Sequence, residues 1–248
     1  MKFLFQNLFF EPLYNALVWL SAFLPNHSIG LAIVILTLVV KLLLFPLQHH
    51  MSRTQAKLRT LESEFKNLKA KYADNKTEQT KQVLALYRLH GVNPFISIVL
   101  LLIQLPIFFA LFYVFKDSFT FHPEWLYSFV VPPAVLNTKL FGLIEMTEKS
   151  VWLAVASGLT QFIQIRLASP PQAAAKENQQ GRSLKEELVR SMNVQARYIF
   201  PVMIVFVALG FPSALALYWV VSNLFTIIHE LVVRRRAKSL LLGSEATS

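Results

Sequence analysis

Long apolar blocks alternate with polar ones along the chain, and this alternation constrains the fold more than any other feature. Of the 248 residues, 54% are hydrophobic and only 15% are charged, whereas a soluble domain carries roughly 25% charged residues. Several blocks have the length needed to cross about 30 Å of hydrocarbon as a helix. The pattern excludes a disordered chain, a collagen-like chain and an ordinary soluble enzyme. It predicts an all-α integral membrane protein.

The apolar block at 198–233 is too long for one span, and a Gly-Phe-Pro-Ser turn at 210–213 divides it into two. Five spans result. The five spans are expected at 28–48, 94–115, 150–168, 198–210 and 213–233. On the outer side we expect an interfacial amphipathic helix at 1–27 and a loop at 116–149. On the cytoplasmic side we expect a helical hairpin at 49–93, a loop at 169–197 and a basic tail at 234–248.

The distribution of Lys and Arg predicts the orientation. Basic residues gather in 49–93, 169–197 and 234–248, and few lie in the loops on the other side. Since cytoplasmic loops are enriched in Lys and Arg, the N-terminus is expected outside and the C-terminus in the cytoplasm. This agrees with an odd number of spans. It also accounts for the net charge of +10 without a DNA partner.

The polar segment at 49–93 has the pattern of packed helices. Apolar residues recur there at spacings of three and four, the repeat of a helix that packs on another helix. The residues are Leu58, Leu61, Phe65, Leu68 and Tyr72. The sequence at 73–75 breaks the pattern before a second helical stretch. We therefore expect a helical hairpin outside the membrane.

Lys41 is the most informative single residue, because it lies inside the first predicted span. A Lys at such a depth costs roughly 2.5–3.5 kcal/mol on insertion scales. One interpretation is that the side chain reaches to the cytoplasmic interface. The other is that the cation faces a hydrated cavity. Thr37 and Gln48, four residues before and seven after Lys41, share its helix face and favour the cavity.

Other spans carry polar side chains at helical spacings. They are Ser97 and Gln104 on the second span, Ser157, Gln161 and Gln164 on the third, and Tyr218, Ser222 and Asn223 on the fifth. For any one of them, hydrogen bonding between neighbouring helices is the simpler explanation. Polar rows on four spans, together with Lys41, favour a shared hydrophilic groove.

The sequence contains no recognisable catalytic constellation. It has no cysteine, no Gly-rich phosphate loop, no HExxH motif and no Ser/His/Asp arrangement. We therefore expect neither an enzyme nor a metal or cofactor site. The residues alone leave open a small anion transporter or channel that uses Lys41. They also leave open a membrane scaffold whose hairpin recruits cytosolic partners.

Short motifs along nearly the whole chain resemble those of the YidC/Oxa/Albino family of membrane protein insertases, in the same order and spacing. They are Glu11-Pro12-Leu13-Tyr14-Asn15, Thr37-Leu38-Val39-Val40-Lys41, Phe45-Pro46-Leu47, Gly91-Val92-Asn93-Pro94, Gln104-Leu105-Pro106-Ile107-Phe108, Phe211-Pro212-Ser213-Ala214 and Leu217-Tyr218-Trp219. The chain departs from the family pattern at 96–100, where a Gly-Cys-Leu-Pro is common, and at His229, where a Gln is common.

The resemblance implies five helices around a hydrophilic groove that is open to the cytoplasm and to lipid, with Lys41 at the position of the groove cation. It also implies a compact form in the bacterial cytoplasmic (inner) membrane. The expected partners are nascent membrane proteins, the ribosome, the Sec translocon and the lipid bilayer, and the chain is expected to be a monomer. In the insertase mechanism that the resemblance implies, short polar flanks of a nascent membrane protein pass through the groove, and Lys41 attracts the acidic ones. The apolar substrate segment then slides into lipid past Leu101, Leu105 and Phe109.

Overall fold

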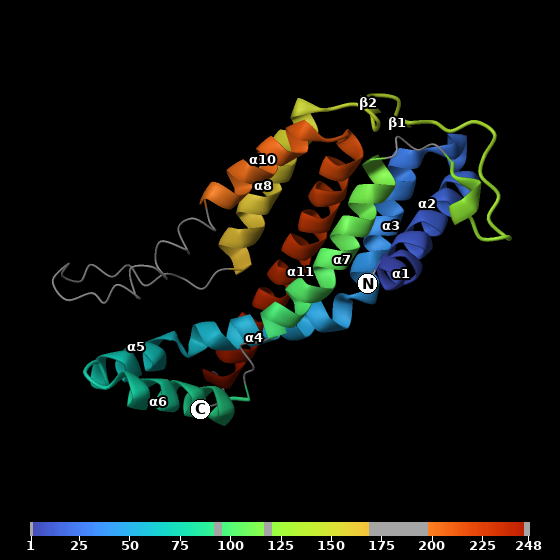
Figure 1. Cartoon of the computed structure of the whole chain (residues 1–248). Helices are drawn as coiled ribbons and strands as arrows, with labels where there is room; N and C mark the ends of the chain where they lie inside the picture. Colours follow the sequence, from blue (N-terminus) through green and yellow to red (C-terminus); the bar gives the residue numbers. More distant parts are fainter. Residues whose placement is uncertain (1, 92–95, 117–120, 169–197, 246–248) are drawn as a thin grey trace.

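The computed structural model describes residues 2–91, 96–116, 121–168 and 198–245. The described chain is mostly helical, which agrees with the all-α membrane protein that the sequence predicts. Figure 1 shows α3, α7, α11 and the pair α8 and α10 as a bundle, with α4 to α6 at one end and a short sheet at the other. The expected loop at 169–197 lies outside the described residues.

The N-terminal segment is a continuous helical stretch built of α1 (Lys2–Phe5), the π-helical turn η1 (Gln6–Phe10) and α2 (Glu11–Phe23). Pro12 lies in the first turn of α2, directly after the π-helical turn, and has no N–H to donate to the preceding turn. The buried side of α2 includes Tyr14, Leu17 and Val18, and α2 packs against α3 (Ile29–Leu43). This segment is therefore part of the bundle. Its place in the membrane interface stays a prediction.

A sharp bend interrupts the first predicted span. Ser28 follows the 3-10 turn η2 (Pro25–His27) and caps α3, because its Oγ accepts a hydrogen bond from Leu31 N at 3.4 Å. After α3, the chain bends by 61° into α4 (Phe45–Thr60). Pro46 lies in the first turn of α4 and has no N–H to continue the hydrogen bonding of α3. The range 28–48 thus consists of α3 and the first turn of α4.

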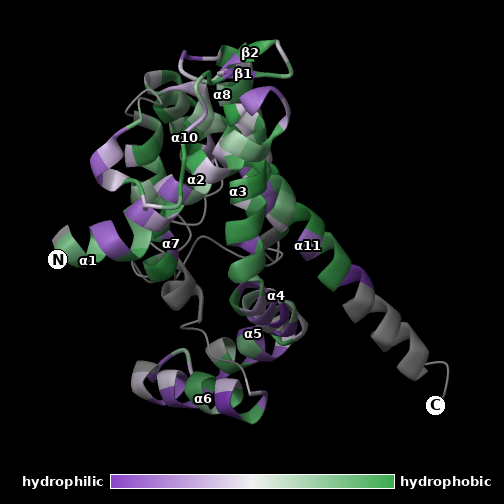
Figure 2. Cartoon of the chain, turned by 90° about the vertical axis from the view of Figure 1, so that its right-hand side faces the viewer, coloured by the Kyte–Doolittle hydropathy of each residue, from purple (hydrophilic) through white to green (hydrophobic). Residues whose placement is uncertain are grey.

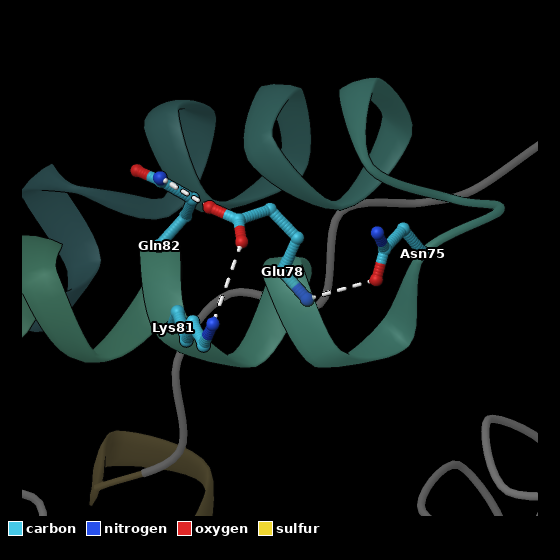
Figure 3. A network of polar contacts seen from close by, with 4 residues as sticks. All are labelled: Asn75, Glu78, Lys81 and Gln82. Carbon is cyan, nitrogen blue, oxygen red and sulfur yellow. Dashed lines mark hydrogen bonds and ion pairs between the residues drawn. The ribbon is translucent and has the colours of Figure 1, made fainter.

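The hairpin consists of α5 (Glu62–Lys71) and α6 (Lys76–Leu89), which lie side by side in Figure 1. The rings of Phe65 and Tyr87 pack between them, with centroids 5.0 Å apart. Asn75 Oδ1 accepts from Glu78 N at 3.0 Å, which satisfies a free donor at the start of α6 (Figure 3). Figure 2 shows the hairpin as the more hydrophilic end of the chain and the bundle as largely hydrophobic.

Residues 121–150, between α7 (Ile96–Lys116) and α8 (Val151–Ala168), contain short regular elements. They include the 3-10 turn η3 (Pro123–Trp125) and an antiparallel pair of strands, β1 (Lys139–Leu140) and β2 (Ile144–Glu145). The sequence predicts a loop here, without strands. Two-residue strands carry too little alternation to be recognised in a sequence.

The helix α11 (Ser213–Glu245) follows α10 (Phe200–Gly210) after a turn at Phe211 and Pro212, close to the predicted division. It continues past 233 into the expected tail. Its part Ser213–Arg235 is long and apolar enough to cross a membrane, and α3 with α4 passes the same test as one bent span. Leu102–Phe115, Val151–Leu167 and Phe200–Gly210 are shorter apolar helices.

The core forms where α11 meets the other helices, since α11 packs against α3, α4, α7 and α8. Leu215, at the start of α11, is buried together with Ile33 of α3 and with Leu111 and Phe115 of α7. The packing of α8 against α10 is close enough to require a glycine. A Cβ on Gly158 would meet the Val205 side chain, and it would lie 3.0 Å from Pro201 O.

We expect Gly158→Val to force α8 and α10 apart and to lower the free energy of unfolding by about 1–3 kcal/mol, the usual cost of overpacking. The measurement is thermal unfolding of the purified chain in detergent. Gly210→Val is the matched control, because a Cβ on Gly210 meets nothing within 4 Å. Equal thermal stability of the two variants would contradict the packing described for Gly158.

Candidate functional site

Four polar side chains lie on α11 in the part of the helix that faces its neighbours. Tyr218, Ser222 and Thr226 follow one another at intervals of four residues and therefore share one face, and Asn223 lies beside them. Tyr218, Ser222 and Asn223 are buried and Thr226 is half-buried. The contacts of these residues join α11 to α3, α7 and α8 in turn. This row is the candidate functional site.

Lys41 lies in the last turn of α3 and only 7% of it is exposed. Its Nζ donates a hydrogen bond to Thr226 Oγ1 at 3.4 Å, and Thr226 Oγ1 donates to Ser222 O at 2.9 Å. The C-terminal end of a helix carries a partial negative charge, which favours a cation in this last turn. Thr37 is also buried, but its Oγ1 donates to Ile33 O of its own helix at 2.7 Å. The ammonium is thus turned toward α11.

The second contact of the row joins α7 to α11. Gln104 Nε2 donates to the hydroxyl oxygen of Tyr218 at 2.7 Å. Gln104 is half-buried, and Tyr218 is 2% exposed. A buried phenol normally keeps a hydrogen-bond partner. The two residues were predicted separately from the spacing on their spans, and the fold brings them together.

The third contact joins α8 to α11. Asn223 Nδ2 donates to Ser157 O at 3.4 Å and to Thr160 Oγ1 at 3.2 Å. Ser157 Oγ is fully buried and donates to Ala154 O of its own helix at 2.7 Å. The Asn223 side chain thus links α11 to α8, whereas the Ser157 hydroxyl bonds within its own helix.

Two glutamines have buried oxygens that are not satisfied. Among the described residues, Gln48 Oε1 and Gln164 Oε1 are buried and have no hydrogen-bond partner. A buried acceptor without a hydrogen bond lowers the stability by about 1–3 kcal/mol. Such an atom is normally satisfied by water or a ligand. Gln48 lies on α4 and Gln164 near the end of α8. Gln161 is half-buried one turn earlier on α8.

Of the residues predicted to guide an apolar segment into lipid, Leu105 and Phe109 are exposed on one face of α7. Ser97 and Leu101 belong to the same helix, but their side chains lie outside the described residues. The roles of all these residues stay predictions.

Two contacts near the end of the row are not predicted by the sequence. Helical spacing places Thr226 near Ser222 on the fifth span but does not pair it with Lys41. His49 Nδ1 and His229 Nε2 are 3.0 Å apart and join α4 to α11. Close by, Glu230 pairs with Arg234 at 3.3 Å, and Arg234 also donates to Leu167 O of α8. Residues 180 positions apart give no sequence signal of contact.

Comparison with known proteins identifies the family. Residues 19–240 match the profile of the family described as 60Kd inner membrane protein. The chain belongs to this family. It is 31% identical over 229 residues to "Membrane protein insertase YidC" of Cellvibrio japonicus, with 91% of this chain and 36% of that protein covered.

Two other relatives in the family have a more similar length. "Membrane protein insertase YidC 1" of Bacillus anthracis is 28% identical, with 94% of this chain and 82% of the relative covered. "Membrane protein insertase YidC" of Staphylococcus aureus is 29% identical, with 90% and 73% covered. The chain spans about a third of the length of the Cellvibrio relative but most of these two.

We expect the bond between Gln104 and Tyr218 to hold α7 on α11. Tyr218→Phe and Gln104→Leu should each lower the free energy of unfolding by about 1 kcal/mol, the usual net value of one hydrogen bond. The double variant should be less destabilised than the sum of the two. Thermal unfolding in detergent of the four proteins measures this coupling. Strictly additive losses would mean that the two groups do not interact.

Proposed function

We propose that the chain is a membrane protein insertase that moves short polar flanks of nascent membrane proteins through a hydrophilic groove and releases their apolar segments into lipid. The observation that carries this proposal is the buried Lys41 beside the polar row of α11. The names of the relatives, all membrane protein insertases, support the same activity.

The hydrogen bonding of Lys41 supports a hydrated groove. An ammonium has three donors, and among the described residues it makes one hydrogen bond, to Thr226 at 3.4 Å. No carboxylate of the described residues lies within ion-pair distance of it. A buried charge without a counterion is strongly disfavoured in a dry interior. We infer that water occupies the space beside Lys41 and Thr226.

Such a groove would lower the barrier for a polar chain end. Water inside the bundle shortens the low-dielectric path, and Lys41 attracts an acidic flank. At about 4 Å, two opposite charges gain on the order of 1 kcal/mol in water and about 4 kcal/mol near a protein surface. This attraction is strong enough to recruit a flank and weak enough to release it.

Release into lipid would occur along α7. Leu105 and Phe109 point out of the bundle and offer an apolar surface to a substrate helix. Burial yields about 0.8 kcal/mol for each methylene group that leaves water, so the apolar segment can drive its own transfer. We propose that Leu101 belongs to the same surface, and that Ser97, Ser157, Gln161 and Gln164 line the groove with the row of α11.

We further propose that the chain lies in the bacterial inner membrane with the hairpin on the cytoplasmic side. The basic charge of the hairpin supports this orientation. The outer end of the bundle then carries β1 and β2. The ribosome and the Sec translocon are the proposed partners at the cytoplasmic end, and the monomer is the proposed functional unit.

An anion channel that uses Lys41 is the alternative drawn from the sequence. The relatives do not support it, because the three compared above are all named insertases. Purified chain in liposomes separates the two functions. Anion flux without insertion of a substrate would contradict the proposal.

We expect Lys41→Ala to slow the insertion of a substrate with an acidic flank by about tenfold, since the loss of 1–2 kcal/mol of attraction changes a rate by that factor. Lys41→Arg should insert it normally. The measurement is protease protection of the translocated flank in liposomes that contain the purified variant.

A substrate whose flank carries Asn and Gln in place of the acids is the matched control, and Lys41→Ala should insert it nearly as well as the native chain. Full insertion of the acidic substrate by Lys41→Ala would refute the role of the charge. Loss of both substrates with an intact fold would indicate that Lys41 serves hydration of the groove in general.

A further inference from the structure

An apolar turn projects from the end of the bundle opposite the hairpin. The turn joins β1 to β2, and its residues Phe141 and Leu143 are 75% and 86% exposed. Leu143 N donates to Leu140 O at 3.0 Å and closes the turn. Turn residues are usually small or polar, so two large apolar side chains at this tip require an explanation.

The backbone at the tip makes the choice of residues more unusual. Phe141 has φ +49° and Gly142 has φ +73°, as in the type I′ turn that favours Asn and Gly at these positions. A bulky side chain is rarely found with positive φ. The conformation of the turn therefore does not account for Phe141, and neither does packing, since its side chain is exposed.

The turn is held at a fixed level by hydrogen bonds to the helix ends. Ile29 N, in the first turn of α3, donates to Asn137 O at 3.0 Å. On the other strand, Ala214 N at the start of α11 donates to Met146 O at 3.1 Å. The sheet is thus anchored where α3 and α11 begin, at the end of the bundle that lies at the top of Figure 1.

Close packing adds to this anchorage. The side chain of Leu140 lies directly on Gly30, where a Cβ would come within 2.8 Å of it. Asn137, just before β1, also forms a parallel β-bridge with Ser28, just before α3. The two chain segments therefore run side by side in the same direction at this point. The turn 141–143, which follows Leu140, therefore lies next to the first turns of α3 and α11.

The two residue pairs of the sheet differ in polarity. Lys139 is paired with Glu145, and Leu140 with Ile144 next to the tip. At the same end of the bundle, Trp152 in the first turn of α8 is 84% exposed. Aromatic and apolar side chains next to a basic residue are typical of the membrane interface.

We propose that the turn Phe141–Leu143 inserts into the outer leaflet of the bilayer, with Lys139 at the level of the lipid headgroups. The occupant of this surface is lipid rather than protein, because the exposed apolar turn is fixed where the apolar helices α3 and α11 begin. The insertion anchors the outer ends of α3 and α11. The inference rests on the membrane placement in the proposed function.

The chain has no cysteine, so a single introduced cysteine can carry a nitroxide label at a chosen site. We would label Leu143→Cys, with Phe141→Cys as a second position and Lys139→Cys as the matched exposed control. Leu224→Cys reports on the membrane-spanning part of α11, where Leu224 is exposed. The full chain is placed in vesicles of phosphatidylethanolamine and phosphatidylglycerol.

Oxygen, which concentrates in lipid, and a water-soluble nickel chelate then compete to relax each label. We expect the ratio of oxygen to nickel accessibility to be about fivefold higher at residues 141 and 143 than at residue 139, because apolar side chains at an interface lie below the headgroups. The same ratio at all three positions, with residue 224 in lipid, would overturn this inference and leave the proposed function intact.

Two other outcomes would also contradict insertion of the turn. Labels at 141 and 143 that neither relaxer reaches would mean that a protein surface covers the turn. Labels at both 143 and 224 that the nickel chelate reaches freely would contradict the membrane placement itself, and with it the proposed function.

Discussion

The hydrogen bond between the ammonium of Lys41 and Thr226 is the interaction on which the functional account depends. The bond holds Lys41, which is only 7% exposed, between α3 and α11. A charged group at such a place would be strongly disfavoured in a dry, purely apolar interior. The proposed function supplies water to stabilise the cation there. The row of α11 carries the hydroxyl and amide groups that would bind this water, and the same helix contributes Leu215 to the apolar core. One helix thus carries both polar and tightly packed apolar side chains.

The three contacts of the row differ in what they leave available. Gln104 and Tyr218 satisfy one another, and Asn223 is satisfied by α8. These bonds fix α7 and α8 on α11 without water. Lys41 and Gln48 are less well satisfied, and both lie toward the end of the bundle near the hairpin. The direct hydrogen bonds of the row thus lie on α7 and α8, and its less satisfied groups lie on α3 and α4.

The helical fold, the face shared by Thr37 and Lys41, and the turn near 211 could be predicted, because each depends on residues close together in sequence. The pairing of Gln104 with Tyr218 could not be predicted, although both were selected, since helical spacing gives a face but not its neighbour. The same limit applies to His49 with His229. The strands at 139–140 and 144–145 were missed because their pairing depends on attachment to α3 and α11. The bend before Pro46 was missed because a proline predicts the end of a helix but not the angle of the next one.

That bend places the buried cation next to a joint in the backbone. The helix α4 leaves α3 at 61°, and Lys41 lies in the last turn of α3, just before that joint. The hairpin follows at the far end of α4. In the proposed function, a client that docks on the hairpin would therefore act on the buried charge through one continuous stretch of backbone.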